Sequence, residues 1–284
     1  MSILVTDGER GLSLYDRAMG RSVRLDCECP CWPCAARGLL LCACQNCRDV
    51  VGFARGSLQK TLRCPGLPAL CALRASPCGR YLYQMSSEAD CVHTRLMATG
   101  DLQYGRKTGV FPRGMRLHSS GRWLIAAGGA SGEAELLRAP SLRLEKRFAA
   151  PGAVCAADFW QDGLALLCAV ENGDLQTQLL TVSSSSGQME ELLRLEGQPG
   201  DLCTCPDGVT AIFSTLGGVA KVALRTGRLL WNLPQHPLCG RIECLGEWAL
   251  LSDGLSGGAA LCPHNQPWLT RIADSSPGAQ ACFC

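Results

Sequence analysis

The sequence predicts an all-β fold: a single seven-bladed β-propeller of four-stranded blades that spans residues 1–284. Three observations predict it. A pattern of four short strands returns along the chain about every 40 residues, which is the length of one propeller blade. Links that contain proline separate the copies, and no stretch shows sustained helical periodicity. The segment Met189–Leu195 comes closest to a helix, but it is short and suits the outer strand of the fifth unit.

The clearest copy of the pattern runs from Ala69 to Gly109. Its first turn, Ser76–Arg80, contains Pro77 and Gly79, two residues that favour turns over strands. One strand therefore ends before this turn and the next begins after it. Its four predicted strands are Cys71–Leu73, Tyr81–Tyr83, Val92–Leu96 and Leu102–Arg106. Four strands joined by three turns make one blade, so this segment defines the unit.

The second strand of each unit marks the repeat, because a glycine or charged turn precedes it and bulky apolar residues fill it. These strands start near residues 3, 39, 81, 123, 164, 209 and 248. Proline lacks the N–H that a sheet ladder needs, so the prolines at 65, 112, 151 and 199 lie between units. We therefore expect seven units with no linker between domains.

The two ends of the chain complete one unit together. The N-terminus begins at a second strand, Ile3–Val5, with no innermost strand before it. The C-terminal Ala281–Cys284 resembles an innermost strand with no unit after it. We expect this strand to join the N-terminal blade and close the ring, because closure removes the exposed sheet edges of an open array.

Composition limits the classes of protein and of partner. Hydrophobic residues make up 47% of the 284 residues and charged residues 18%, which is typical of a well-buried globular chain. The net charge of +2 favours neither nucleic acid nor an acidic membrane surface as a partner. No apolar window reaches the length of a membrane span, and the first residues lack a signal core. The 20 cysteines are spread over a long chain, so we expect reduced thiols in a cytoplasmic monomer.

Two turn-and-strand segments carry a resemblance to a known family. Ser76–Tyr83 reads SPCGRYLY and Ser119–Ile125 reads SSGRWLI. Both resemble the SPDGRYLY signature of bacterial seven-bladed YVTN and WD-repeat-like propellers. The resemblance covers the whole chain as a fold and points to no particular member. The Trp-Asp and Gly-His pairs of true WD repeats are absent, which argues against the eukaryotic scaffold subfamily.

The leading functional interpretation is a non-catalytic binding or scaffold protein with a protein partner. Some relatives with this signature are sugar lactonases, so the resemblance implies an alternative: a lactonase-like hydrolase with its site in the central channel. Catalytic strings occur at residues 254–258, 57–60 and 100–105, but each requires a helix where the pattern places a hairpin. The four histidines, His93, His118, His236 and His264, fall on different units. The sequence thus assigns no catalytic or cofactor-binding residue.

The cysteines divide into two sets. One recurs on innermost strands, where a buried thiol acts as a small hydrophobe, and is assigned to the core: Cys71, Cys155, Cys203, Cys205, Cys239, Cys244 and Cys282. The other is dense near the N-terminus and includes two C-x2-C pairs, Cys31/Cys34 and Cys44/Cys47. Zinc is the cofactor that such spacing suggests, and the blade assignment selects Cys29, Cys31, Cys44 and Cys47 as its ligands. The favoured interpretation is nevertheless that these thiols are buried or idle and that the chain holds no cofactor, with the zinc site as the alternative.

The two faces of the predicted ring differ in charge. Acidic residues dominate the hairpins on the face where the inter-blade links enter. The opposite face collects arginines, which would suit docking of an acidic protein partner there through Arg80, Arg122 and Arg228. The favoured interpretation is that these are ordinary solvated turns, and docking is the alternative. The arginines assigned to this face are Arg17, Arg21, Arg37, Arg55, Arg74, Arg80, Arg122, Arg138, Arg225 and Arg228.

Overall fold

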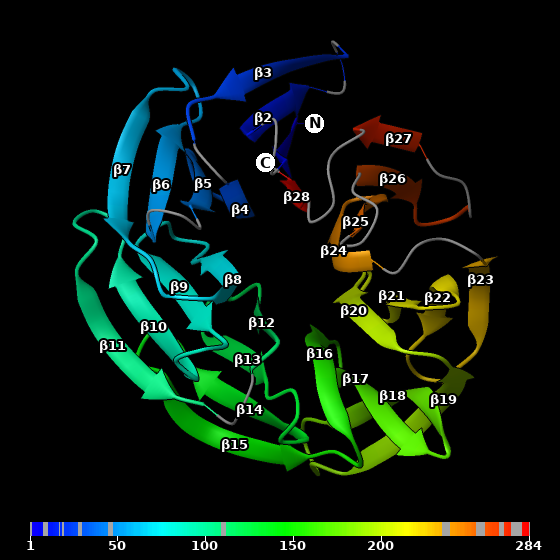
Figure 1. Cartoon of the computed structure of the whole chain (residues 1–284). Coiled ribbons are helices and arrows are strands. Elements are labelled where there is room, and N and C mark those ends of the chain that lie inside the picture. Colours follow the sequence, from blue (N-terminus) through cyan, green and yellow to red (C-terminus); the bar gives the residue numbers. More distant parts are fainter. Residues whose placement is uncertain are drawn as a thin grey trace.

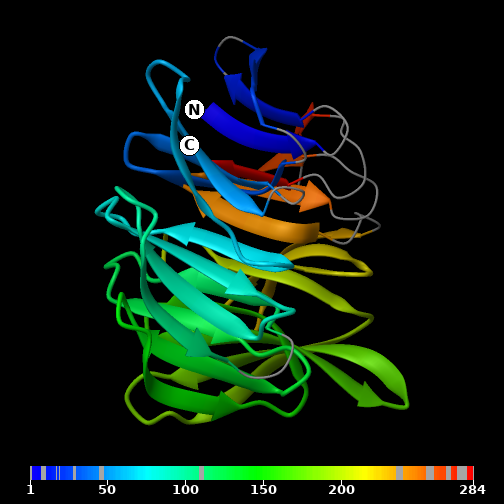
Figure 2. The ribbon, with the colours of Figure 1, turned by 60° about the vertical axis from the view of Figure 1, so that its left-hand side comes forward.

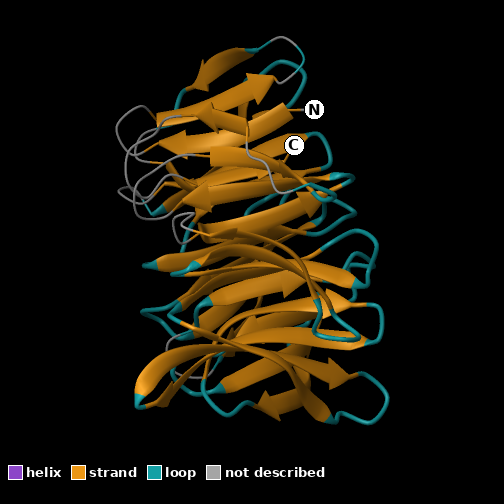
Figure 3. Cartoon of the chain, turned by 90° about the vertical axis from the view of Figure 1, so that its right-hand side faces the viewer, coloured by secondary structure: helices purple, strands orange, loops and turns teal. Residues whose placement is uncertain are grey.

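The computed structural model describes residues 2–7, 11–16, 18, 20–27, 30–44, 48–108, 112–234, 239–253, 259–266, 270–273 and 280–283. These residues form seven four-stranded antiparallel sheets, arranged as blades around a ring (Figure 1). Strands are the only regular elements in the described part of the chain (Figure 3). The predicted fold class, a seven-bladed β-propeller, is confirmed.

The blades are numbered by their order around the ring, and the strands of each blade follow from the innermost to the outermost. Blade 1 contains β28 (Gln280–Phe283), β1 (Ser2–Asp7), β2 (Gly11–Asp16) and β3 (Arg21–Leu25). Blade 2 contains β4 (Pro30–Ala36), β5 (Leu39–Cys44), β6 (Asp49–Ala54) and β7 (Lys60–Pro65). Blade 3 contains β8 (Leu70–Ala75), β9 (Tyr81–Ser86), β10 (Cys91–Leu96) and β11 (Leu102–Lys107).

The remaining four blades follow the same order. Blade 4 contains β12 (Gly114–Leu117), β13 (Trp123–Ala127), β14 (Glu133–Arg138) and β15 (Arg143–Ala149). Blade 5 contains β16 (Ala153–Trp160), β17 (Gly163–Asn172), β18 (Asp174–Ser183) and β19 (Met189–Glu196). Blade 6 contains β20 (Pro199–Thr204), β21 (Thr210–Thr215), β22 (Gly218–Ala223) and β23 (Leu229–Pro234). Blade 7 contains β24 (Cys239–Leu245), β25 (Trp248–Asp253), β26 (Ala259–Pro263) and β27 (Thr270–Ala273).

The ring closes within blade 1. The C-terminal strand β28 pairs antiparallel with β1, with Ile3 opposite Phe283 and Val5 opposite Ala281. The two ends of the chain therefore lie side by side, as Figures 1 and 2 show. This pairing confirms the closure predicted from the two incomplete ends of the sequence.

The core is divided among the blade–blade contacts. Seven clusters of buried apolar side chains each join one pair of neighbouring blades, so every interface of the ring has its own core. Alternation along each strand sends successive side chains to the two neighbouring blades, which is why one strand serves two clusters. The cysteines with described side chains are all free thiols, and most of them are buried within these clusters.

Turn chemistry explains why the signature segment ends one strand and begins the next. The Ser76 hydroxyl accepts hydrogen bonds from the amides of Arg80 and Tyr81, at 3.1 and 2.9 Å. Gly79 has a φ of 73°, a left-handed conformation that side chains other than glycine adopt with strain. Together they close the hairpin between β8 and β9. Within the described residues, no helix is long and apolar enough to cross a membrane.

Candidate anion site in the central channel

The innermost strands surround the central channel and leave one edge of each blade without a partner strand (Figure 1). Buried backbone groups on such an edge need hydrogen-bond partners. Carboxylates of three successive blades supply them. Asp158 accepts from the amide of Thr204 at 2.8 Å and Asp201 from the amide of Ile242 at 2.8 Å. Glu243 accepts from the amide of Phe283 at 3.2 Å.

Two arginines satisfy edge carbonyls and also pair with these acids. Arg116 Nη2 donates to Asp201 Oδ2 at 2.7 Å and to the carbonyls of Leu202 and Ile242 at 3.0 and 2.9 Å. Arg241, whose side chain is 2% exposed, donates through Nη1 to the carbonyl of Pro33 at 2.7 Å. Its Nε also donates to Glu243 Oε1 at 3.1 Å. Both cations are therefore well compensated.

Arg74 is compensated much less. Within the described residues it has one hydrogen bond, from Nη1 to the carbonyl of Leu73 at 3.0 Å. The carboxylate that pairs with it, on Glu243, lies 3.9 Å away. Desolvation, followed by the positive charges of Arg241 and Arg116, lowers the pKa of Arg74 to about 10. Arg74 is thus a partly buried cation, with its side chain 15% exposed and its paired anion 3.9 Å away.

A pocket of about 230 Å³ opens beside these arginines. Its wall comes from the innermost strands of six blades, near the residues where the strands start, so it lies at the end of the channel where the inter-blade links enter. The charged residues among the described lining are four arginines and one aspartate: Arg74, Arg113, Arg116, Arg241 and Asp201.

This lining is suited to an oxyanion. A guanidinium presents a planar fork of N–H donors that matches a carboxylate or a phosphate and is less strongly hydrated than an ammonium group. Arg116 and Arg241 are already paired with Asp201 and Glu243, so the excess of positive charge in this partly desolvated space comes from Arg74 and Arg113. Coulomb interactions are stronger there than in bulk water. The pocket can therefore bind the negatively charged group of a ligand.

The structure corrects one assignment made from the sequence. Arg74 was expected on the arginine-rich face opposite the links, but it lies in β8 and lines the central pocket. Arg116 and Arg241 were not expected in a site at all. The sequence did show one arginine in or next to the predicted innermost strand of each of these three blades. Alternation alone could not show that these three side chains from three blades meet.

The arginines proposed for partner docking lie elsewhere. Arg80, Arg122 and Arg228 are exposed in the hairpins β8–β9, β12–β13 and β22–β23. These hairpins are at the end of the channel opposite the pocket, and none of the three side chains lines it. Their role in docking stays a prediction.

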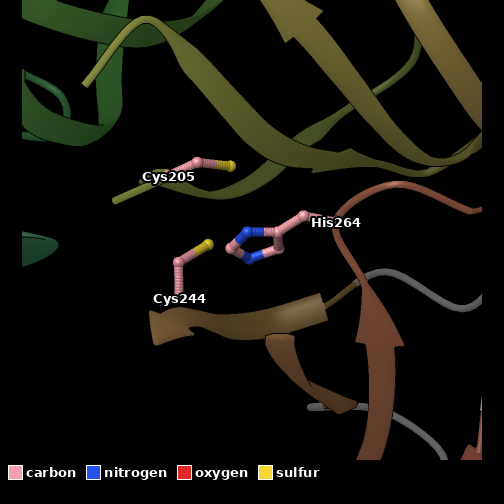
Figure 4. Close-up of side chains that lie close together, drawn as sticks. All are labelled: Cys205, Cys244 and His264. Carbon is pink, nitrogen blue, oxygen red and sulfur yellow. The ribbon is translucent and has the colours of Figure 1, made fainter. Parts of the chain in front are cut away.

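The zinc ligands proposed from the sequence fall partly outside the described residues, which exclude Cys29 and Cys47. Cys31 lies in β4 opposite Ala43, and Cys44 is buried in the core between blades 1 and 2. That site stays a prediction. The structure brings together a different group of possible ligands, Cys205, Cys244 and His264 (Figure 4). The sequence had placed both of these cysteines in the core and had shown no histidine near them.

Comparison with known proteins supports the fold. No family model and no curated protein matches the sequence. Among solved structures, a hydrazine synthase of Kuenenia stuttgartiensis superposes with a TM-score of 0.69 at 15% identity, over 86% of this chain and 79% of that one. A functionally unknown protein from Desulfotomaculum acetoxidans gives a TM-score of 0.75 at 12% identity, over 99% and 98%. A protein from Lactobacillus plantarum gives 0.73 at 12%, with both chains covered in full.

These likenesses define the class of protein. At such low sequence identity they show a shared seven-bladed propeller architecture and carry no function across. The chain is therefore a β-propeller with a positively charged central pocket.

Proposed function

We propose that this chain is a non-catalytic binding protein whose central pocket receives a carboxylate group of an acidic protein partner. The observation that carries the proposal is the lining of the pocket, in which four arginines face a single aspartate. Asp201 already pairs with Arg116 and Glu243 with Arg241, so Arg74 and Arg113 carry the positive charge that is available to a ligand. Arg74, whose paired anion lies 3.9 Å away, is the residue that a ligand carboxylate would compensate most.

The size of the pocket favours a partner's side chain or chain end over a whole small molecule. Its volume of about 230 Å³ is below the roughly 300–1,000 Å³ that is common for sites enclosing small-molecule ligands. A glutamate side chain or a C-terminal carboxylate projecting from a protein surface fits such a space. The rest of the partner would then rest on the hairpins and links around the channel.

The test uses Arg74→Met, which keeps the length of the side chain and removes its charge. We expect a short capped oligoglutamate peptide to raise the Tm of the wild-type protein in a buffer of low ionic strength. Binding to the native state at a concentration of 100 Kd stabilises a protein by about 2.7 kcal/mol. This stabilisation should be lost in Arg74→Met, while the Tm of that variant without peptide stays equal to or above that of the wild type.

Arg143→Met is the matched control, because Arg143 is exposed on the outer strand β15 and pairs with Glu145. This variant should respond to the peptide as the wild type does. Acetate and phosphate at equal concentration form the second arm. If they stabilise the protein as strongly as the peptide, the pocket is a site for free anions. If peptide and anions both have no effect, or Arg74→Met responds normally, the proposal is wrong.

The alternative that the sequence resemblance implies, a lactonase-like hydrolase, would use the same channel. Incubation of the wild-type protein with a panel of sugar lactones, with hydrolysis followed by acid release, separates the two. Turnover that disappears in Arg74→Met would replace the binding proposal by the enzymatic one.

A further inference from the structure

A second group of reactive side chains lies between blades 6 and 7, at the end of the channel opposite the pocket. Cys205 follows β20, Cys244 lies near the end of β24 and His264 follows β26. Their potential ligand atoms all lie within 4.8 Å of one another. Figure 4 shows both thiols and the imidazole converging on one space. The three side chains therefore come from three separate places in the chain, one within a strand and two directly after strands.

Cys205 occupies a position that has a turn-forming role in another blade. Its amide bonds to the carbonyl of Thr210 just as the amide of Ser76 bonds to that of Tyr81, both at 2.8 Å. In blade 3 the Ser76 hydroxyl then accepts two turn amides. In blade 6 Asp207 does this instead, accepting from the amides of Val209 and Thr210 at 2.9 Å each. The turn therefore does not need the Cys205 side chain.

His264 replaces an apolar residue of the other blades. Its amide bonds to the carbonyl of Glu247, in the hairpin between β24 and β25. The residues that make the corresponding bond in blades 3, 4 and 6 are Met97, Ala139 and Leu224. His264 is 7% exposed, and its Nε2 atom is buried without a hydrogen-bond partner among the described residues. A buried polar atom without a partner destabilises a fold, which points to a ligand that the site is built to receive.

The electrostatics favour the metal-binding forms of Cys205 and His264 but not of Cys244, whose pKa is raised by hydrogen bonding with Cys203 and Cys205 and by desolvation. A hydrogen bond from Cys244 is the largest influence on Cys205 and, with Thr210 and the charge of Lys221, lowers the pKa of its thiol in spite of desolvation. Desolvation, followed by the charge of Lys221, lowers the pKa of His264 and so favours the neutral imidazole. Thiolates and neutral imidazoles are the ligand forms for zinc.

We propose that Cys205, Cys244 and His264 form a zinc site that joins blade 6 to blade 7. Two thiols and one imidazole are a ligand set that tetrahedral Zn²⁺ accepts. At Zn–S distances of about 2.3 Å, a tetrahedral ion holds two sulfurs about 3.8 Å apart, so the three side chains need to close in by at most about 1 Å. Binding releases both thiol protons, and the two thiolates neutralise the charge of the ion.

Cys203 is a further thiol at this interface. It lies in β20 two residues before Cys205, and the Cys244 thiol donates to its backbone carbonyl at 4.0 Å. Either Cys203 or a water molecule completes four ligands. In the first case the site is a closed structural one, and in the second it keeps an open position.

The test measures zinc uptake by the reduced full-length chain, purified after chelation and then dialysed against ZnSO₄. We expect about one zinc per chain and a higher Tm than in the metal-free protein. His264→Leu restores the apolar side chain of the other blades and should fold, yet lose at least about 100-fold in zinc affinity, because even outer-shell changes lose 10–100-fold. Cys205→Ser and Cys244→Ser should behave alike.

Two controls keep the result specific. Cys78→Ser changes an exposed thiol in the equivalent turn of blade 3 and should bind zinc as the wild type does. A Cys44→Ser/Cys47→Ser double variant tests the ligands proposed from the N-terminal sequence. Zinc that persists in this double variant and disappears in folded His264→Leu supports the present site. Zinc that persists in His264→Leu, or a wild-type protein that takes up none, overturns it.

Cobalt supplies a readout that does not depend on stability. Co²⁺ in a tetrahedral site with thiolate ligands gives sulfur-to-metal charge-transfer absorption in addition to strong visible bands, and these are expected for the wild type and for Cys78→Ser. Their absence from the wild-type spectrum under reducing conditions would contradict thiolate ligation at this interface.

Discussion

The same residue type has different roles in this protein because its surroundings differ. Arg116 and Arg241 reach across the channel to backbone carbonyls and acids, and their positive charge is balanced. Arg74 lies next to them with a hydrogen bond to its own neighbour's carbonyl and an acid 3.9 Å away. Two of these arginines therefore hold the channel together, and the third is the one that we propose to bind a ligand.

Glu243 is the acid on which this balance depends. It pairs with Arg241, and it accepts from the amide of Phe283 in the closing strand β28. Glu243→Gln keeps the shape and removes the charge, which leaves a buried arginine uncompensated. Loss of one partner of a buried pair costs about 3–5 kcal/mol. We expect a decrease of about 3 kcal/mol in the free energy of unfolding at pH 7, measured with urea.

The pH dependence of this effect follows from the pKa of Glu243. Desolvation raises that pKa, but Arg241 and Arg74 outweigh it and hold it below the usual 4.5. The stabilisation is therefore fully present above pH 4.5 and is lost as the pH falls through the lower folded value. The difference between wild type and Glu243→Gln should be constant from pH 6 to 8 and shrink in acid. A difference that grows in acid would contradict this. As a control, Glu145→Gln on the exposed strand β15 should change the free energy of unfolding little.

At the scale of the elements, the innermost strands β20 and β24 each contribute to both ends of the channel. The start of β20 supplies Asp201 to the pocket, and the residue after its end is Cys205 of the proposed zinc site. Between these two positions, Leu202–Thr204 pair in regular register with β21, after a register shift that includes Asp201. An inserted residue in β20 would therefore disturb both sites, since a shift by one turns every later side chain to the other face.

The hairpins at the arginine-rich end carry a separate prediction. Arg80, Arg122 and Arg228 are exposed, so reversing their charge together should leave the fold intact. If this face docks an acidic protein, the wild-type chain should retain that partner in a pull-down. The triple variant Arg80→Glu/Arg122→Glu/Arg228→Glu should lose it, and binding to the wild type should weaken as the salt concentration rises. Capture that is unchanged by the triple reversal, yet lost in Arg74→Met, would assign docking to the pocket end instead.

At the scale of the whole molecule, stability depends on closure of the ring. The strand β28 contributes Ala281, Cys282 and Phe283 to the clusters on both sides of blade 1. Because each blade is held by its two neighbours, a missing strand weakens two of the seven interfaces and exposes the edge of β1. The ends of the chain are therefore as important to the core as its middle.

Deletion of residues 279–284 tests this dependence. Full burial of a large apolar side chain stabilises a fold by about 1.5–3 kcal/mol, and the buried Cys282 and Phe283 side chains would be lost. An unpaired edge also promotes association between chains. We expect a large decrease in Tm and the appearance of oligomers in light scattering. A truncated chain that melts like the full-length protein and stays monomeric would show that closure is dispensable.

The sequence by itself determined the architecture. Period-two alternation, the turn at Ser76–Arg80 and its counterparts, and the prolines between units are local signals, and each acts within a few residues of the chain. Even the closure by β28 could be predicted, because an incomplete unit at one end requires its missing strand from the other. The repeat therefore specified the blades, their order and the ring.

Only the tertiary structure decided where the chemistry lies. Arg74, Arg116 and Arg241 belong to different blades, and Cys205 and His264 to two neighbouring ones, so no spacing in the sequence links them. Their meeting depends on the angle between blades and on which side of each innermost strand a residue falls once the ring has closed. That geometry is set by the packing of seven interfaces together, which is why an arginine expected on the surface lies in the channel and cysteines assigned to the core converge on a histidine.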